Sequence, residues 1–490
     1  MIKLIKYPTH YLLEGYELGE NAALERALSK FERFANGGCR FDPVGYVYDS
    51  ETKRMRIPGG MNPYHVMKLT GYKIDASNNN YDPYDNISIR CVSSPRDELQ
   101  IDMLQFLIGE GKFTENKWNP QLACNAATGV GKTFGAIATQ TYMRCRMLVI
   151  VNRTNIANNW MSECLKFTDV DKERILLLDT STCRDIVEGR LNPLKYYTFF
   201  VLQQTLRSFA TSEGYSWQSV GELFARLRIG LKVYDEANME FRNTLMIDCY
   251  TNTYKTLYLT ATMKRSDMGE NIVFQRAFKA VPKFDQYALG YNDSKKHIIM
   301  LLIRYNSYPS VVWRSKCKSS GHGFNAKVHS DYQISDDSEF YDIIFDLIDR
   351  YTVQKNFRTL LLVSKINSCD IIAEQLREMF PNKKIGIYNS SIGKVEKARV
   401  LEEDEIIISI TKSLGFSETI SNLRMVINCE AFRFDGTGDQ ASGRLRKLPN
   451  NENCLYVELC DDGFPSITKQ VRDRIGFYTK LFQRIIEIKR

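Results

Sequence analysis

The sequence lacks the features that would place it in or across a membrane. No apolar run approaches the length of a bilayer span, and residues 1–10 have no signal-peptide core. The twelve cysteines are scattered without C-x-x-C spacing, which argues against a zinc ribbon or a disulfide framework and is typical of a reducing cytoplasm. Cys317, His322 and His329 lie near one another, but no fourth ligand accompanies them. We interpret them as loop residues of a polar insertion.

The composition is that of an ordinary globular protein with a mild basic excess. Hydrophobic residues make up 43% of the chain and charged residues 25%, and the formal net charge is +8. This charge fits a nucleic-acid partner, although many basic proteins bind none.

Two stretches alternate short apolar runs with amphipathic segments, which is the pattern of parallel sheets with crossover helices. The first spans about 95 to 270, and the second begins near 340. The apolar runs of the first are Leu122–Cys124, Met147–Val151, Ile175–Leu178, Tyr197–Leu202, Leu231–Tyr234 and Thr256–Leu259; those of the second are Thr359–Val363, Ile385–Tyr388, Glu405–Ser409, Met425–Asn428 and Cys454–Glu458. The sequence therefore predicts two consecutive α/β units.

The remaining segments complete a four-part organisation. Residues 1–90 are rich in Tyr, Gly and Asn and end in a polar run; we expect a small α+β accessory domain with a hairpin over residues 46–58. Residues 91–270 form the first α/β unit. Residues 271–340 form a connector with an insertion, and residues 341–490 form the second unit.

The sequence Ala127-Thr-Gly-Val-Gly-Lys-Thr133 follows an apolar strand and precedes a helix-compatible run, as a phosphate-binding loop does. Gly129 and Gly131 let backbone N–H groups converge on phosphate oxygens, and the helix N-terminus adds its dipole. Lys132 would contact the β- and γ-phosphates of ATP, and Thr133 would be a ligand of Mg²⁺.

An apolar strand ending in two acids follows about a hundred residues later, in Leu231-Lys-Val-Tyr-Asp-Glu-Ala-Asn238. Asp235 would hold Mg²⁺, directly or through water. Glu236 would orient and deprotonate the attacking water. Together with Lys132, the two acids predict an ATPase site.

The stretch Asp235-Glu-Ala-Asn238 resembles the Asp-Glu-Ala-His or Asp-Glu-Ala-Asp box of superfamily 2 helicases, with Asn in the last place as a departure. Downstream, Leu259-Thr-Ala-Thr262 resembles the family's Ser/Thr-Ala-Thr motif, which links the state of ATP to the grip on nucleic acid. The hydroxyls of Thr260 and Thr262 can hydrogen-bond the acidic box, which gives that coupling a physical route.

Two loops that follow predicted strands resemble the family's strand-contacting motifs, which bind the sugar–phosphate backbone. The residues that this resemblance assigns to nucleic acid are Thr154, Asn155, Gln204 and Thr205. Upstream of the phosphate loop, Gln100 is the candidate for the family's adenine-reading glutamine. Its separation from Arg96 is one residue longer than the family pattern.

The second α/β unit carries two more such motifs. The stretch from Thr411 to Leu423 resembles Thr-x-x-x-Gly-x-Gly-x-Asp-Ile-Pro-x-Leu, and the resemblance assigns Thr411 to nucleic-acid binding. The stretch from Gln440 resembles Gln-x-x-Gly-Arg-x-x-Arg, whose arginines act in the family as in-cis fingers on the γ-phosphate. Here Gln440 takes the coupling position and Arg444 the first finger. The second finger is Arg446 or Lys447, and lysine lacks the planar guanidinium.

These motifs occur in one order over roughly residues 95 to 460, so the resemblance to superfamily 2 helicases covers most of the chain. It implies an α/β fold of two tandem RecA-like parallel-sheet lobes with a small α+β N-terminal domain. It also implies a helicase or translocase that uses ATP and Mg²⁺ to unwind or remodel nucleic acid, with single-stranded or branched DNA favoured, in replication, recombination or repair. Proteins of those processes would be its partners.

The compact two-lobe form with a small N-terminal domain is similar to the helicases of large tailed phages, some of which remodel branched DNA. A viral chain of this kind would act in the host cytoplasm.

Other functions remain to be weighed. RNA stays open as the substrate, because such motors contact mainly the backbone. A packaging-type ATPase fused to a nuclease would need a carboxylate cluster for two-metal cleavage in its second half, where this chain instead has the Gln440 motif. A non-catalytic protein with a decayed motor is disfavoured by the intact Lys132, Thr133, Asp235 and Glu236.

The predicted N-terminal hairpin combines aromatic and basic side chains. Strand alternation would place Arg54 and Arg56 on one exposed face, opposite Met55 and Ile57. Two such cations suit the phosphates of a duplex ahead of the motor. The alternative is a structural domain that covers the back of the first lobe.

Overall fold

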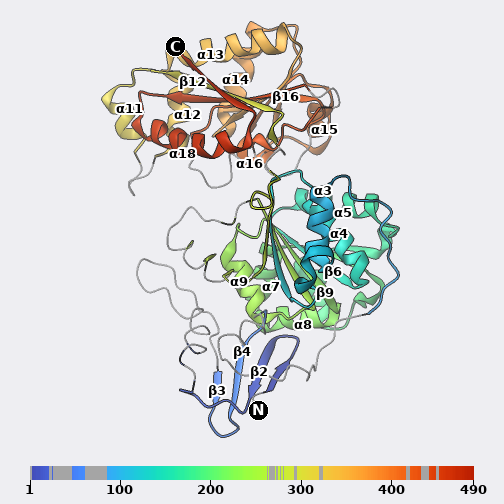
Figure 1. Ribbon diagram of the computed structural model, residues 1–490. Helices are drawn as coiled ribbons and strands as arrows, with labels where there is room; N and C mark the ends of the chain where they lie inside the picture. Colours follow the sequence, from blue (N-terminus) through green and yellow to red (C-terminus); the bar gives the residue numbers. More distant parts are fainter. Residues whose placement is uncertain are drawn as a thin grey trace. The chain divides into compact units, whose positions relative to one another are not determined.

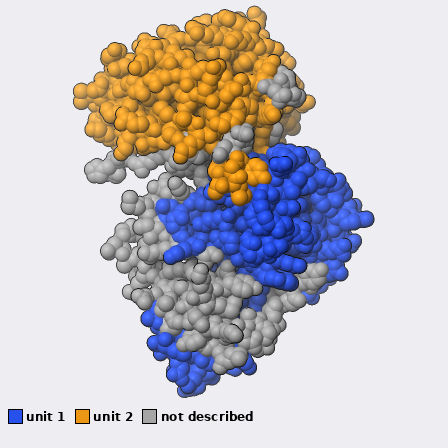
Figure 2. Space-filling model, in the orientation of Figure 1, with its two compact units in different colours: residues 1–126, 130–286 blue, residues 127–129, 287–490 orange. Residues whose placement is uncertain are grey.

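A computed structural model gives the three-dimensional structure of the chain as two compact units. It describes residues 3–20, 22, 25, 47–60, 85–261, 263, 271, 274–275, 278–279, 281–291, 295–318, 324–414, 420–431, 441–448 and 452–490. Unit 1 comprises residues 1–126 and 130–286, and unit 2 comprises residues 127–129 and 287–490 (Figure 2). Among the described residues, no helix combines the length and apolar character needed to cross a bilayer.

Unit 1 contains a seven-stranded sheet in the order β11-β5-β10-β9-β6-β8-β7, with every pairing parallel (Figure 1). Its strands are β5 (Gln121–Asn125), β6 (Arg146–Val151), β7 (Ile175–Leu178), β8 (Thr198–Leu202), β9 (Ile229–Asp235), β10 (Lys255–Thr260) and β11 (Lys283–Asp285). Its helices are α3 (Glu98–Ile108), α4 (Lys132–Met143), α5 (Thr154–Phe167), α6 (Thr180–Val187), α7 (Gln203–Thr211), α8 (Trp217–Leu227) and α9 (Phe241–Tyr250), with short 3-10 turns η2 (Gly111–Asn116), η3 (Lys172–Arg174) and η4 (Pro193–Lys195).

Helices cover both faces of this sheet, which explains its continuously apolar strands. All six residues of β6 are buried, as expected for a strand covered on both sides. Helices α6, α7, α8 and α9 supply one core, with Ile186, Leu206, Leu223 and Phe241 against the strands. Helices α3, α4 and α5 pack side by side on the other face (Figure 1).

Unit 2 repeats this architecture with a second seven-stranded, fully parallel sheet in the order β14-β15-β13-β16-β17-β12-β18. Its strands are β12 (Ile298–Tyr305), β13 (Arg358–Val363), β14 (Ile385–Tyr388), β15 (Ile406–Ile410), β16 (Leu423–Asn428), β17 (Cys454–Asp461) and β18 (Arg484–Lys489). Its helices are α11 (Val311–Lys316), α12 (Ala326–Ser335), α13 (Ser338–Leu347), a π-helical turn η6 (Ile348–Val353), α14 (Ile366–Met379), α15 (Lys394–Glu403), α16 (Thr411–Leu414) and α18 (Pro465–Leu481). The predicted class, two tandem RecA-like sheets, is confirmed.

The boundary between the units differs from the predicted one. The predicted connector, residues 271–340, contains β12 together with α11 and α12. Strand β12 lies between β17 and β18 in the second sheet, and alternate β12 residues enter the cores on its two faces. Its partners β17 and β18 pair with residues 156 and 185 positions earlier in the chain (Ile298 with Cys454, Ile299 with Arg484), so a local pattern cannot reveal the pairing. Unit 2 therefore begins near residue 287 and not near 341.

The N-terminal region forms a four-stranded antiparallel sheet in the order β1-β2-β4-β3, which includes the predicted hairpin. Its strands are β1 (Lys3–Lys6), β2 (His10–Glu14), β3 (Val47–Asp49) and β4 (Arg54–Pro58). The predicted alternation is present in part: Met55 and Ile57 are buried and Arg54 is exposed, but Arg56 is half-buried because it donates to Gln218 of α8. Most of the predicted linker, residues 75–85, lies outside the described residues.

This small sheet belongs to unit 1 and packs at the amino ends of the large sheet's strands. The Asn252 amide, just before β10, donates to the Tyr7 and His10 carbonyl oxygens at 2.7 and 2.9 Å, and its oxygen accepts from Gly60 N at 2.8 Å. Helix α8 contributes Gly221, where a Cβ would lie only 2.4 Å from a Thr9 methyl carbon. The phosphate-loop end of the sheet is the opposite one.

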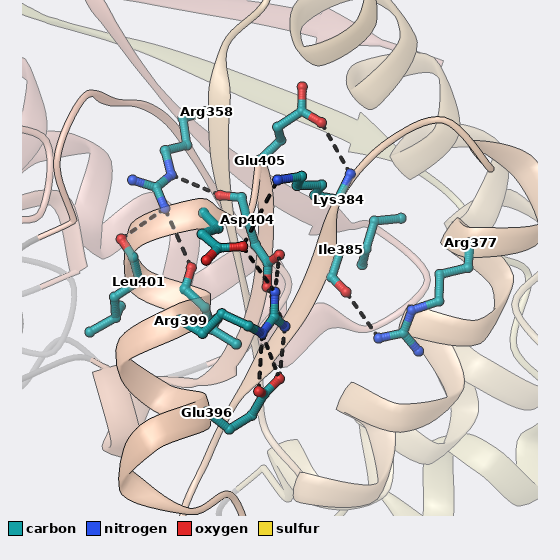
Figure 3. Close-up of polar contacts among 11 residues, drawn as sticks. Arg358, Arg377, Lys384, Ile385, Glu396, Arg399, Leu401, Asp404 and Glu405 are labelled. Atoms are coloured by element: carbon teal, nitrogen blue, oxygen red, sulfur yellow. Dashed lines mark hydrogen bonds and ion pairs between the residues drawn. The ribbon is translucent and has the colours of Figure 1, made fainter.

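The amino ends of the unit 2 strands are closed by a network of charged side chains (Figure 3). The Arg358 guanidinium, at the start of β13, donates to the carbonyl oxygens of Leu401 and Asp404 at 2.8 Å each, which caps the last turn of α15. Arg399 on α15 joins the carboxylates of Glu396 and Asp404. These contacts fix α15 against the sheet.

Candidate nucleotide and nucleic-acid site

The predicted site residues of unit 1 gather at the carboxyl ends of its central strands. In the parallel register, Leu259 of β10 lies opposite Asp235 of β9, and Thr260 lies opposite Asn125 of β5. The phosphate loop follows β5, and the acidic pair ends β9. Open α/β sheets bind their ligands at this edge, so the topology brings together motifs that lie far apart in the sequence.

The phosphate loop has the conformation that its glycines predict. Gly129 and Gly131 have φ of +86° and +103°, values that other residues rarely adopt. Helix α4 begins at Lys132 directly after this loop, and no side chain among the described residues caps it. The Lys132 ammonium is buried and donates to the Ala126 carbonyl oxygen at 2.7 Å, so it lies against the loop. These features fit a triphosphate on a helix N-terminus.

Gln100 of α3 lies against the phosphate loop. Its Nε2 donates to the Val130 carbonyl oxygen at 3.1 Å, and its Oε1 accepts from Arg96 N at 2.9 Å. A Cβ at Gly131 would lie 2.1 Å from that Nε2, so glycine is needed there for the close approach. Gln100 therefore braces the loop, whatever its role toward adenine.

Asp235 is half-buried at the end of β9, where its Oδ2 accepts a 2.8 Å hydrogen bond from Trp160 Nε1. Burial raises the pKa of Asp235 above the usual carboxyl value, and the Trp160 hydrogen bond and the Lys132 ammonium oppose that rise. Trp160 lies on the inner side of α5, the helix that begins at Thr154. The sequence analysis missed Trp160, because a tryptophan in an amphipathic helix is normally a core residue.

Glu236 follows Asp235 in the left-handed region, with φ of +53°. That conformation is unfavourable for a non-glycine residue and is retained chiefly at functional positions. Its Oε2 accepts from the hydroxyl of buried Thr260 at 3.4 Å, a long hydrogen bond between the acidic box and the Thr-Ala-Thr motif. Thr262 lies outside the described residues.

The residues assigned to nucleic acid flank the same edge. Thr154 and Asn155 begin α5 after β6, and Gln204 and Thr205 lie in the first turn of α7 after β8. Thr154 and Gln204 are exposed, and the other two are half-buried.

A second unpredicted residue, Asn152, follows β6 directly. The oxygen and nitrogen of its side-chain amide are buried without a hydrogen-bond partner among the described residues. An amide in this state is suited to a ligand or an ordered water. No motif marks it in the sequence.

In unit 2, Thr411 follows β15, and its hydroxyl donates to the Glu430 carboxylate. Arg444 is buried, whereas Arg446 is half-buried and Lys447 exposed. The segment that carries them is held near the start of β12, where the Lys295 ammonium donates to the Ser442 hydroxyl at 2.8 Å and the His297 ring hydrogen-bonds the Leu445 carbonyl oxygen. Gln440 lies outside the described residues.

The described residues provide oxygen ligands for a divalent cation that binds together with a nucleotide. They do not form a metal site from protein ligands alone. They contain no group of three or more His, Cys, Asp or Glu residues arranged around one point. The Thr133 hydroxyl and the Asp235 carboxylate are the hard oxygen donors that Mg²⁺ prefers, and Mg²⁺ commonly takes few protein ligands together with substrate phosphates. Of the Cys317, His322 and His329 stretch, His322 lies outside the described residues.

Comparisons with known proteins agree with this geometry. Residues 93–265 match the family model described as "Type III restriction enzyme, res subunit". Two solved structures of S. cerevisiae Dbp5 bound to RNA and ADP BeF3, one of them a point variant, have a similar fold. Their TM-scores are 0.53 and 0.51 at 13% and 12% identity, and each alignment covers 80% of this chain and 89% of that chain. No curated protein matches the sequence.

Residues 93–265 are thus similar to a helicase-type ATPase domain, and the chain is an ATP-hydrolysing enzyme.

Proposed function

We propose that this protein is an ATP-dependent helicase or translocase that acts on DNA, single-stranded or branched, in replication, recombination or repair. The observation that carries the proposal is the convergence of Lys132, Asp235 and Glu236 at one edge of the unit 1 sheet, beside the helix starts at Thr154 and Gln203. ATP hydrolysis and binding of the nucleic-acid strand would then take place at the same edge of one sheet.

Each residue has a definite task in hydrolysis. Lys132 and the N-terminus of α4 bind the β- and γ-phosphates, while Glu236 takes the proton of the attacking water and Gln100 holds the loop toward the nucleotide. Bound Mg²⁺, held by Thr133 and Asp235, would neutralise phosphate charge. Arg444, with Arg446 or Lys447 as a second cation, would stabilise the charge that builds on the γ-phosphate.

Coupling between ATP and the strand would run through two contacts in unit 1. Thr260 reaches Glu236, and Trp160 connects Asp235 to α5, whose first residues, Thr154 and Asn155, would bind the backbone. A strand that moves the start of α5 would therefore shift the indole that orients the Mg²⁺-binding carboxylate. Thr262, Gln440 and Thr411 are the other candidates for coupling and grip.

An ATPase assay with different nucleic acids tests the proposal. We expect single-stranded and forked DNA to stimulate hydrolysis more strongly than duplex DNA, because an open strand gives the grip residues a backbone to hold. Stimulation by RNA alone would indicate an RNA helicase instead. Equal rates with and without any nucleic acid would contradict a motor function.

The structural evidence disfavours the packaging ATPase with a nuclease. The second half of the chain is a seven-stranded parallel sheet of RecA type, and its described residues contain no carboxylate cluster for two-metal cleavage.

A further inference from the structure

The segment that follows β12 is a surface feature that the proposed mechanism does not use. Within five residues it presents three large apolar side chains to water: Tyr308, Val311 and Val312 are 82%, 80% and 59% exposed. Single exposed apolar residues are ordinary, but a cluster of them commonly marks an interaction surface.

Hydrogen bonds to neighbouring elements hold the backbone next to this apolar cluster in place. The buried Asp461 carboxylate accepts hydrogen bonds from the Ser307 backbone and hydroxyl, and the Tyr332 hydroxyl donates to the Ser307 carbonyl oxygen at 3.0 Å. The next residue, Tyr308, has φ of +51°, and its N–H donates to Asn306 Oδ1 at 2.9 Å. The backbone therefore holds Tyr308 outward in an unfavourable conformation instead of folding it into the core.

Helix α11 continues the same arrangement. Its N-cap, Ser310, accepts from Trp313 N at 3.3 Å, and the Trp313 ring packs on Tyr332 with centroids 5.5 Å apart. Cys317 at the end of the helix is buried. One side of α11 is thus fixed to unit 2, while Val311 and Val312 face solvent.

The stretch of sequence that carries the cluster contains basic residues but no acidic ones. From Tyr305 to Ser330 the sequence contains four basic residues and no Asp or Glu. The four are Arg314, Lys316, Lys318 and Lys327. All are exposed, and none forms an ion pair with another described residue. Such cations are available to the phosphates of a nucleic acid.

We propose that residues 308–318 form an additional binding site for single-stranded nucleic acid. Bases would stack on Tyr308 and pack on the two valines, and Arg314, Lys316 and Lys318 would bind the phosphates. An aromatic platform among cations is a general solution for holding a single strand without sequence preference.

The location of the segment agrees with this role. Because the unit 2 sheet is fully parallel, β12 ends at the same edge as β15, after which Thr411 lies. A protein partner is the weaker fit, because three apolar side chains provide little of the apolar area that protein interfaces bury.

The test measures the affinity of the full-length protein for a fluorescent oligothymidylate by anisotropy, over a salt titration. Tyr308→Ala should weaken binding about tenfold, as the loss of one stacked base does. Replacing Arg314, Lys316 and Lys318 together by alanine should also lower the slope of log affinity against log salt by about two. The matched control is Val353→Ser with Lys355→Ala, exposed residues of the same unit just before β13; it should bind like the parent.

A photo-crosslinking oligonucleotide gives a second readout, because it should label the peptide that contains Tyr308. The inference rests on the proposed function, but the experiment gives different results when the proposed function is wrong and when only the additional site is wrong. If the protein is no strand-binding motor, the parent itself neither binds the oligonucleotide nor shows stimulated ATPase. If the parent binds and is stimulated while both variants bind as tightly as it does, residues 308–318 are not a strand-binding site, and a protein partner becomes the better explanation.

Discussion

The two edges of the unit 1 sheet differ in whether their buried amide groups have hydrogen-bond partners within the protein. At the amino edge, the Asn252 side chain finds partners for its oxygen and its nitrogen within the N-terminal sheet. At the carboxyl edge, the Asn152 amide is buried without a partner among the described residues. Buried polar groups without a partner in the protein are suited to a ligand, so this contrast between two amides distinguishes the reactive edge from the structural one.

Unit 2 shows the same contrast. At its amino edge, Arg358 and Arg399 are occupied by carbonyl and carboxylate oxygens of the same unit. At its carboxyl edge, the chain after β12 exposes the Tyr308 side chain to solvent. A parallel sheet therefore allows one edge to stabilise the fold while the other is shaped for ligands.

The largest effect should come from the reactive edge of unit 1. Glu236→Gln should lower kcat about ten-thousandfold and retain ATP binding, because the water loses its base but the phosphate contacts stay. Lys132→Ala should abolish turnover and weaken ATP binding as well. Steady-state hydrolysis and binding of a fluorescent ATP analogue measure the two effects. Parental turnover in Glu236→Gln would mean that the acidic box is wrongly assigned.

Removing the arginine finger should have the next largest effect. Arg444→Ala should reduce kcat about a thousandfold with little change in nucleotide affinity, since a finger acts mainly in the transition state. Arg446→Ala and Lys447→Ala, measured side by side, identify the second cation, because only the one that acts should lower kcat. If Arg444→Ala hydrolyses ATP normally, unit 2 supplies no finger from this position.

The sequence was sufficient for the architecture and for the conformation of the phosphate loop, because both depend on local patterns. Apolar runs such as that of β6 predicted buried parallel strands, and the glycines at 129 and 131 predicted the loop. It was insufficient where function depends on contacts between distant segments. Trp160 touches Asp235 across 75 residues of chain, and β12 pairs with strands more than 150 residues later, Ile298 with Cys454 and Ile299 with Arg484.

Trp160→Phe should have an intermediate effect at the reactive edge. Phenylalanine keeps the packing but removes the indole N–H, which helps to lower the pKa of Asp235. That pKa should rise further, so the acid limb of the kcat–pH profile should move to higher pH, with about tenfold lower activity on that limb. Trp118→Phe, in which the replaced indole is exposed, is the control. Superimposable pH profiles would show that the hydrogen bond does not tune Asp235.

Variants of the structural edge should change stability more than activity. Arg56 donates to Gln218 of α8 at 2.9 Å, and Arg54 pairs with Glu14 within the small sheet, so both cations already have partners in the protein. Arg56→Ala should lower the free energy of unfolding by about 1 kcal/mol and leave ATP turnover unchanged.

The duplex-binding hypothesis for Arg54 and Arg56 makes a different prediction. If it holds, replacing both by Glu weakens forked-DNA binding most strongly at low salt. If the sheet is purely structural, the variant and the parent have the same fork affinity at every salt concentration. Forked-DNA anisotropy therefore decides between the two roles.

The last prediction concerns His10, which lies in β2 where the small sheet meets unit 1 and should change stability with pH while leaving ATP turnover unaffected. Burial, and then the nearby Arg56 cation, lower the pKa of His10 to about 4 from 6.5. Between these two pH values the unfolded chain binds more protons than the folded one, so the free energy of unfolding should fall as pH decreases from 6.5 to 4 and then level off. His10→Gln should remove this part of the pH dependence. Thermal unfolding at pH 7 and pH 5 gives the loss of unfolding free energy in the parent and in the variant. The difference between the two losses is the contribution of His10, because the other titrating groups contribute equally to both proteins. Equal losses in both proteins would mean that His10 titrates normally and that the small sheet does not exclude its charge.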